Sequence, residues 1–459
     1  MQGAIKKTDW INNQFYVRML ILHLGYGLVI YLIPALSQII LLVILASFLF
    51  VIIDRKNKGN EALMAAAYIA GGEVFFRQTN AVIFYETGKY AVIVFLLIGM
   101  FFKGTSSKTV PFWIYLLILF PGVVVASYTM SYEAEFRKAI AFNIAGPVCL
   151  GISALYCYYK KIKKEDFQRV LIMLFMPLIA QITYLYLFTP SMDEVSISLS
   201  GNYAATAGYG PNQISTVLGI GCFLLCTRLF TIRNRMINLI DVSLLVLMGY
   251  RAVVTFSRGG VFTALVCVVA FLIFFYFKQE AKKMQGTNTR IIFIVVVFVG
   301  VWLFTSLETS GLIGNRYTNR DAAGQLKDDI STGRAELIET ELTAFYHHPL
   351  IGIGVGKGYE YRKENLGINI ATHNEVSRLL SEHGLLGVFA LVILIFVPLT
   401  FWFKFKNNYY FLAFVAFWFL TINHSAMRIA LPAFVYGLAL LYIVDEKKNP
   451  VHRKRLAGK

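Results

Sequence analysis

Long apolar runs separated by short polar gaps dominate the pattern of the chain. A run of roughly 17–25 apolar residues has the length of a helix that crosses the hydrocarbon core of a bilayer. The pattern predicts an all-α polytopic membrane protein with about 12–14 transmembrane helices, the lower number applying if the short runs 61–76 and 408–422 are tilted, re-entrant or merged with neighbours. The predicted spans are 15–34, 36–53, 61–76, 81–102, 110–128, 139–159, 167–189, 211–230, 237–256, 258–277, 290–307, 377–403, 408–422 and 426–444.

One long polar stretch, 308–376, interrupts these runs. Inside it, 331–345 has an apolar stripe at helical spacing, which predicts an amphipathic helix that ends at His347-His348-Pro349. The stripe consists of Leu337, Ile338, Leu342 and Phe345. The expected organisation is therefore about 11 spans in 1–307, one large extracytoplasmic loop at 308–376, C-terminal spans in 377–444 and a basic cytoplasmic tail at 445–459.

The composition agrees with a membrane protein. Hydrophobic residues make up 57% of the chain and charged residues 15%, against about 45–50% and about 25% in soluble domains. The net charge of +17 does not point to nucleic acid, because the basic residues fall in short gaps between apolar runs. All five cysteines lie inside apolar runs, and His347, His348 and His383 do not form a zinc set, so we expect no disulfide framework, no metal and no cofactor.

Lysine and arginine are concentrated in every second gap, for example in 55–58, 160–164 and 228–235. Short cytoplasmic loops carry such an excess of positive charge. Both termini are therefore expected in the cytoplasm. The stretches 129–138, 190–210 and 308–376 are then expected outside.

Four candidate site residues lie near the outer ends of predicted spans: Arg137, Arg251, Arg258 and His373. Ionisable groups at membrane depth are costly unless they are paired or line a cavity, so they are candidates for function. Arginine binds phosphate through planar, bidentate hydrogen bonds. A neighbouring histidine can take a proton from an attacking hydroxyl near neutral pH.

Each candidate also has a purely structural interpretation. Arg251 could extend to the lipid headgroups, and Arg258 could cap a turn whose glycines, Gly259 and Gly260, let two helices approach. The segment Thr372-His373-Asn374-Glu375 has the pattern of a capping box, with Thr372 as N-cap and Glu375 three residues later. The glycine-rich segment 352–358 resembles a phosphate loop but matches neither Walker A nor the dinucleotide fingerprint, which favours a flexible turn.

An ordered set of motifs resembles the O-antigen ligase and O-antigen polymerase superfamily. In chain order, the motifs are Ser257-Arg258-Gly259-Gly260, then Gly333-Arg334, then His348-Pro349-Leu350-Ile351-Gly352-Ile353-Gly354, then His373-Asn374 and finally Glu382-His383-Gly384-Leu385-Leu386-Gly387. They cover about 240 to 400. In the N-terminal half, Gly210-Pro211-Asn212 resembles an element often found in that family.

The resemblance implies a glycosyltransferase at the periplasmic face of the bacterial inner membrane, with an undecaprenyl-pyrophosphate-linked glycan as donor. It implies that Arg258 binds the pyrophosphate, with Arg137, Arg334 and Arg251 as further donor-binding candidates. It also implies that His373 activates the acceptor hydroxyl or orients it. Asn374, Glu382 and Ser257 are expected to support them. The reaction would invert the anomeric carbon without a metal.

The acceptor would decide the activity within this family. A ligase transfers the glycan to lipid A core, a polymerase to another lipid-linked repeat unit, and some relatives to a protein hydroxyl. We favour the ligase, with the polymerase as the main alternative. A lipid-linked oligosaccharide flippase is disfavoured, because the large loop lies off-centre and has no counterpart in the first half, whereas transporters usually contain repeated halves.

Overall fold

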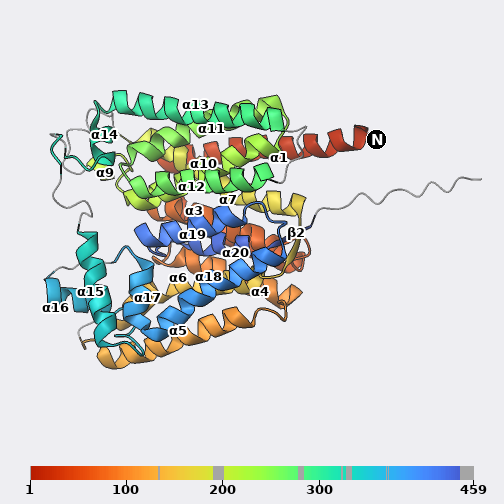
Figure 1. Cartoon of the computed structure of the whole chain (residues 1–459). Coiled ribbons are helices and arrows are strands. Elements are labelled where there is room, and N and C mark those ends of the chain that lie inside the picture. The colour runs from red at the N-terminus through yellow and green to blue at the C-terminus, as the bar shows by residue number, and fades with distance from the viewer. Residues whose placement is uncertain are drawn as a thin grey trace, which may run out of the picture.

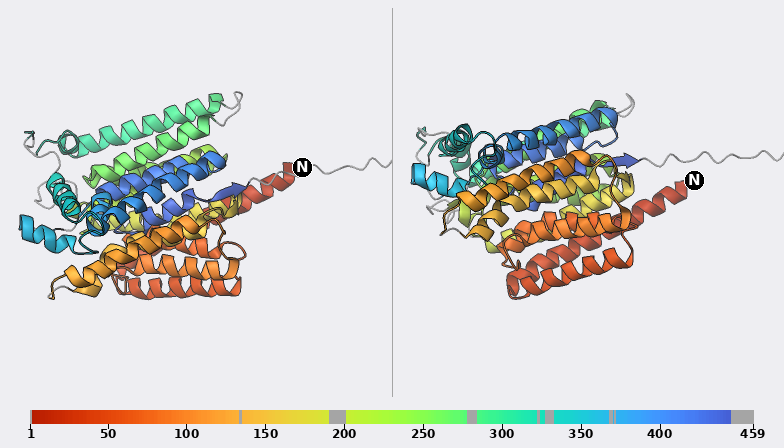
Figure 2. Two further views of the ribbon diagram at one scale, coloured as in Figure 1. Left: turned by 60° about the horizontal axis from the view of Figure 1, so that its bottom comes forward. Right: turned by 90° about the horizontal axis from the view of Figure 1, so that it is seen from below.

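The computed structural model describes 2–132, 135–189, 201–277, 284–321, 324–326, 333–367, 370 and 372–444. Within these ranges it describes the side chains from 13 onward, except those of 201, 202, 277, 284 and 285. Long helices lie side by side and form an all-α polytopic bundle (Figures 1 and 2). Along the first half of the chain they are α1 (Gln2–Leu32), α2 (Leu36–Asp54), α3 (Glu61–Gln78), α4 (Thr87–Lys103), α5 (Val110–Thr129), α6 (Phe136–Cys157) and α7 (Lys164–Phe188).

The second half continues the bundle and adds short helices at one end. It contains α9 (Gly201–Ala204), α10 (Pro211–Thr231), α11 (Arg235–Val254), α12 (Arg258–Phe277), α13 (Met284–Glu308), α14 (Leu312–Tyr317), α15 (Arg334–His347), α16 (Gly358–Leu366), α17 (Glu375–His383), α18 (Leu385–Lys404), α19 (Phe411–His424) and α20 (Ala430–Ala439). Two three-residue strands, β1 (Lys161–Lys163) and β2 (Tyr442–Val444), pair in parallel. The basic tail 445–459 lies outside the described residues.

Ten helices among the described residues are long and apolar enough to cross a membrane, fewer than the fourteen ranges predicted. They are α1, α2, α5, α6, α7, α10, α11, α12, α13 and α18. The predicted span 377–403 is divided at Gly384, whose φ of +60° separates α17 from α18. A side chain on Gly384 would lie 2.5 Å from the carbonyl oxygen of Pro349, so this break is fixed by close backbone packing.

The helices α19 and α20 form a short hairpin in place of two complete spans. With 14 and 10 residues, they extend roughly 21 and 15 Å at 1.5 Å per residue, less than the ~30 Å hydrocarbon core. The turn that joins them, 425–429, therefore lies within the depth of the bundle.

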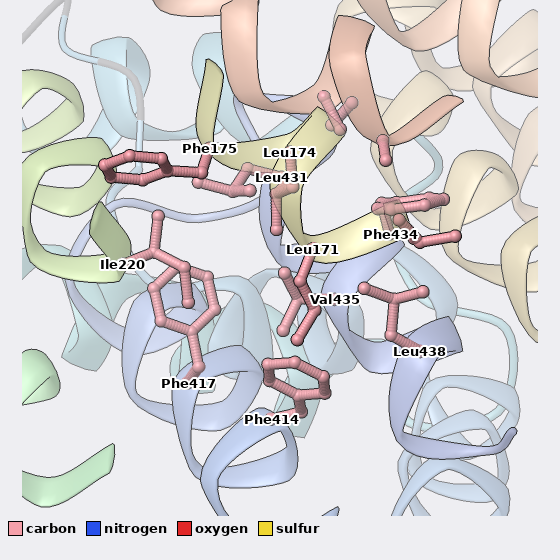
Figure 3. Packing of buried hydrophobic residues seen from close by; sticks show 14 of the residues in the cluster. Leu171, Leu174, Phe175, Ile220, Phe414, Phe417, Leu431, Phe434, Val435 and Leu438 are labelled. Carbon is pink, nitrogen blue, oxygen red and sulfur yellow. The ribbon is translucent and has the colours of Figure 1, made fainter. Parts of the chain in front are cut away.

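Apolar side chains of α7, α10, α19 and α20 interlock in the centre of the bundle (Figure 3). Close helix contacts surround this core, because lipid gives little hydrophobic drive for association and small residues let backbones approach. A Cβ on Gly71 of α3 would lie 2.1 Å from the carbonyl oxygen of Leu174 on α7. One on Gly146 of α6 would lie 2.5 Å from that of Met427 beside α20. The α19–α20 hairpin is thus clamped between the first and second halves of the chain.

The two ends of the bundle differ in what they carry. The start of α1 and the strand β2 lie at one end, and α14, α15, α16 and α17 lie at the other (Figure 1). This arrangement fits the alternation of basic gaps, which predicts that the end with α15 faces outward.

Cysteine labelling tests this orientation. In spheroplasts, we expect a membrane-impermeant thiol reagent to modify Asn365→Cys on α16 and to leave Lys56→Cys and Lys161→Cys unmodified until the membrane is permeabilised. The three positions are exposed, and the five native cysteines are buried, so the background should be low. Labelling of Lys161→Cys in intact spheroplasts would reverse the orientation.

Candidate active site

The turn before α12 is shaped by a strained residue and two glycines. Phe256 has a φ of +54°, and α12 begins two residues later at Arg258. A Cβ on Gly260 would lie 2.4 Å from the backbone carbon of Ser215, so this glycine lets α12 approach α10. A Cβ on Gly259 would lie 2.5 Å from Cδ2 of His424, so this glycine makes room for the end of α19. The glycines therefore bring three helix ends together around Arg258.

Ser257 connects the same turn to the start of α10. Its hydroxyl donates to Oδ1 of Asn212 at 2.8 Å, and its carbonyl oxygen accepts from the hydroxyl of Ser215 at 3.1 Å. The two sequence elements Gly210-Pro211-Asn212 and Ser257-Arg258-Gly259-Gly260 therefore meet in space. These hydrogen bonds hold the turn that carries Arg258.

Three arginines from separate segments gather beside this turn, and we call Arg258, Arg316 and Arg334 the arginine cluster. Arg258 donates to Oδ1 of Asn319, and Nε of Arg316 donates to the carbonyl oxygen of Phe256 at 3.3 Å. Burial lowers the pKa of Arg334, and the positive charges of Arg258 and Arg316 lower it further. Among the described residues, no carboxylate forms an ion pair with the cluster. The cluster is therefore suited to an anionic ligand.

His373 lies close to this positive charge, and burial together with that charge keeps its ring neutral at pH 7. Burial lowers its pKa to about 4, with further contributions from Arg428, then Arg334, then His424. The ring is half-buried, and Nδ1 has no hydrogen-bond partner among the described residues. An imidazole that is neutral at pH 7 has a lone pair available to accept a proton.

The backbone around His373 is fixed by the α19–α20 turn. The carbonyl oxygen of His373 accepts from the amide of Ala426 at 3.0 Å, and that of Thr372 accepts from Nη2 of Arg428 at 2.6 Å. His424, at the end of α19, lies close to Thr216, with 3.3 Å between Nε2 and the threonine oxygen. The hairpin thus brings two further basic residues, Arg428 and His424, to the candidate base.

Two buried carboxylates hold this turn in place. Glu73 of α3 accepts from the amide of Ala430, the first residue of α20, and forms an ion pair with Arg77. Glu375 accepts from the amide of Met427 at 3.2 Å and forms an ion pair with Arg378. Backbone N–H groups at a helix start need such acceptors when no water reaches them. The buried ion pairs therefore position the residues that surround His373.

Glu341 of α15 connects the outer helices to the same loop. Its carboxylate accepts from Nη1 of Arg362 at 2.8 Å, the hydroxyl of Ser377 at 2.6 Å and the hydroxyl of Thr372 at 3.2 Å. These contacts join α15, α16 and α17. They fix both Arg334, at the start of α15, and the loop that carries His373.

The prediction that Thr372 and Glu375 form a capping box is wrong. The N-cap of α17 is Asn374, whose Oδ1 accepts from the amides of Val376 and Ser377, whereas Thr372 bonds to Glu341 and to the backbone of Asn374. Glu375 is engaged with Arg378 and the α19–α20 turn and does not close a box. Thr372 is drawn to Glu341 of α15, while Glu375 bonds to Arg378 one turn along α17 and to the amide of Met427.

Loss of this cap should have a measurable cost. We expect Asn374→Ala to lower the free energy of unfolding of the α17 region by about 1 kcal/mol, measured as increased hydrogen exchange of the amides of 375–378. Asn365→Ala, an exposed asparagine on α16, is the control. Equal exchange in Asn374→Ala and the wild type would show that the cap contributes nothing.

Other candidates lie away from the arginine cluster. Arg137 is exposed on the first turn of α6, and no described contact joins it to His373. Arg251 is buried near the end of α11, with its guanidinium 4.4 Å from the centre of the Tyr186 ring. Glu382 accepts from the amide of Gly356 at 2.9 Å and faces Arg378, so it fastens the glycine-rich loop to α17.

The glycine-rich segment 352–358 is a turn, but it is packed against helices and is not flexible. Its amides donate to the chain itself: Val355 to the carbonyl oxygen of Gly122 at 2.9 Å and Ile353 to that of Ser381 at 2.8 Å. A Cβ on Gly354 would lie 2.6 Å from the backbone nitrogen of Ala126. These amides are engaged within the protein, so the loop does not cradle a phosphate.

Comparison with known families agrees with this geometry. Residues 243–392 match the family model described as O-Antigen ligase. This part of the chain is therefore similar to the O-antigen ligase family. The matched range contains the whole arginine cluster and His373, whereas Glu73, His424 and Arg428 lie outside it. No curated protein matches the chain.

Proposed function

We propose that the protein is an inverting glycosyltransferase that moves a glycan from undecaprenyl pyrophosphate to an acceptor hydroxyl at the periplasmic face of the inner membrane. The similarity of residues 243–392 to the O-antigen ligase family supports transfer of a lipid-linked glycan. The observation that carries the proposal is the position of His373, whose pKa is lowered to about 4, beside the arginine cluster. His373 can accept a proton, and the arginine cluster can bind the negatively charged diphosphate as it leaves.

In the proposed reaction, the acceptor hydroxyl attacks the anomeric carbon while His373 accepts the hydroxyl proton. The bond between the anomeric carbon and the diphosphate oxygen breaks as the new glycosidic bond forms, and attack from the opposite face inverts the configuration. Negative charge develops on the departing diphosphate. Preorganised arginines stabilise that charge at low dielectric, in the role that a divalent ion has in other enzymes, so the reaction requires no metal.

The acceptor that we favour is lipid A core, which makes the protein an O-antigen ligase. The test incubates purified protein in detergent with undecaprenyl-pyrophosphate-linked glycan and either lipid A core or a second lipid-linked repeat unit, followed by mass analysis. Glycan on lipid A core supports the ligase, and a doubled repeat unit identifies a polymerase. Absence of transfer to any hydroxyl acceptor, with protein that retains donor binding, would reject the glycosyltransferase.

A further inference from the structure

A second site lies at the end of the bundle opposite the arginine cluster. A cavity of about 280 Å³ opens between the end of α10 and the first turns of α11 and α13. The α10 helix starts beside Ser257 and runs the length of the bundle to reach it, as Figure 1 shows. The cavity is lined by Leu229, Arg235, Asn238, Leu239, Arg290 and Phe293.

The cavity is positively charged, and no residue in its lining neutralises that charge. Arg235 and Arg290 contribute two guanidinium groups, and none of the lining residues is acidic. The carboxylate of α11, Asp241, is fully buried and engaged elsewhere: it forms an ion pair with Nε of Arg228 at 2.9 Å and accepts from Tyr16 at 2.5 Å. The cavity therefore favours an anion.

The walls of the cavity face lipid. Leu239 is 62% exposed and Phe293 45% exposed, on two helices that are long and apolar enough to span the membrane. A water-soluble anion would gain nothing from these side chains. Acyl chains would cover them, while a headgroup at the helix ends reaches the arginines. Basic pockets between spanning helices bind anionic headgroups in this manner.

A buried hydrogen-bond acceptor indicates that the ligand also donates a hydrogen bond. Oδ1 of Asn238 is buried and has no hydrogen-bond partner among the described residues, while its Nδ2 is 3.5 Å from the carbonyl oxygen of Ile232. An unsatisfied buried acceptor is costly, so a ligand that donates a hydrogen bond is favoured here. The volume is below the about 300–1,000 Å³ of sites that enclose a small molecule. A cavity of this size suits the headgroup of a lipid whose acyl chains remain in the bilayer.

We propose that this cavity binds the headgroup of an anionic phospholipid of the phosphatidylglycerol class. The phosphate lies between Arg235 and Arg290, a glycerol hydroxyl donates to Asn238, and the first methylenes of the tails cover Leu239 and Phe293. The site does not depend on the transfer reaction, because it lies at the other end of α10. It uses residues that no sequence motif singled out.

Native mass spectrometry of delipidated, detergent-solubilised protein tests this site. The protein is titrated with phosphatidylglycerol, phosphatidic acid and phosphatidylcholine of identical acyl chains. We expect phosphatidylglycerol to bind more tightly than phosphatidylcholine. Arg235→Gln should weaken its binding roughly fivefold and the double variant with Arg290→Gln roughly 25-fold, since each arginine contributes a similar electrostatic attraction. Arg233→Gln, an exposed arginine outside the cavity lining, should bind as the wild type does.

A separate variant tests the proposed hydrogen bond from the glycerol hydroxyl to Asn238. Asn238→Leu should weaken phosphatidylglycerol but not phosphatidic acid, whose headgroup has no glycerol. Because Arg235 is exposed, Arg235→Gln should fold even if the double variant does not. Unchanged phosphatidylglycerol binding in Arg235→Gln, or equal binding of phosphatidylcholine and phosphatidylglycerol to the wild type, would overturn the proposal. Full displacement by soluble glycerol phosphate at the same concentration would show a simple anion site and equally overturn it.

Discussion

The variant His373→Ala is expected to lower the turnover of glycan transfer by roughly 10²–10⁴-fold, the usual contribution of a positioned general base. Donor binding should change little, because the arginine cluster remains in place. The loop itself should also survive, since Ala426 and Arg428 bond to backbone oxygens there and not to the imidazole. The measurement is the initial rate with saturating donor and acceptor, together with the dissociation constant of the donor.

Two further variants test whether His373 accepts a proton or has only a structural role. His347→Ala removes an exposed histidine at the end of α15 and should leave the rate unchanged. His373→Gln keeps a polar side chain of similar size but has no basic nitrogen, so it should be as slow as the alanine variant. Activity of His373→Gln close to that of the wild type would show that the residue positions the acceptor without accepting its proton.

The pH dependence follows from the lowered pKa of His373. Burial first, and the neighbouring positive charges second, hold this pKa at about 4, so the ring is neutral and competent at all higher pH values. We expect kcat/KM to be independent of the His373 titration from pH 8 to about 5.5 and to fall with decreasing pH near 4. A bound diphosphate should raise the pKa, so kcat should begin to fall at a higher pH than kcat/KM.

Low pH also lowers the stability of the folded protein through protonation of His373. The rate measurements at low pH therefore need a control. An imidazole with an ordinary pKa of about 6.5 in the unfolded chain takes up a proton before the folded one does. The free energy of unfolding therefore decreases as pH falls between about 6.5 and 4. Rates at low pH are to be compared with rates after return to pH 7, so that reversible titration is distinguished from loss of folded protein.

Local patterns in the sequence were sufficient for much of the fold. The amphipathic helix expected to end at His347-His348-Pro349 is α15, which ends at His347. Its buried face contains Leu337 and Ala344, while the other predicted apolar residues are half-buried. Helical periodicity and a following proline are local signals, so they need no knowledge of the partner helices.

The surroundings of His373 were harder to predict because they come from distant segments. Arg316 is in a polar stretch without periodicity, and its proximity to Arg258 depends on how α14 packs. His424 and Arg428 did leave a signal, since they interrupt an apolar run at 408–444, where ionisable residues are candidates for function. His424 falls in the gap between the predicted spans 408–422 and 426–444, and Arg428 falls inside the second of them. Neither residue was predicted as part of the site.

The buried ion pairs show the same limit. Glu73 and Arg77 fall in or beside the predicted span 61–76, where charge is costly and invites explanation. Their partner is the start of α20, which lies 357 residues further along the chain from Glu73. No spacing rule connects residues so far apart. Only the packed structure shows that these charges hold the α19–α20 turn.

The second large effect is expected at Arg258. The variant Arg258→Ala should lower kcat/KM for transfer by roughly 10²–10³-fold, the loss typical of one preorganised group that binds developing negative charge. Its hydrogen bond to Asn319 orients the guanidinium, and its remaining N–H groups are available for diphosphate oxygens. Arg258→Lys should recover only part of the loss, because lysine keeps the charge and lacks the planar fork.

Matched variants separate the proposed role from a structural one. Arg320→Ala removes an exposed arginine of the same outer segment and should transfer glycan at the wild-type rate. Asn319→Ala leaves Arg258 in place but removes its orienting acceptor, so its effect should be smaller than that of Arg258→Ala. Full activity of Arg258→Ala would mean that the residue only completes the turn before α12. Equal activity of Arg258→Lys and the wild type would mean that the site requires positive charge alone, and that Arg316 and Arg334 provide the directed contacts to the diphosphate.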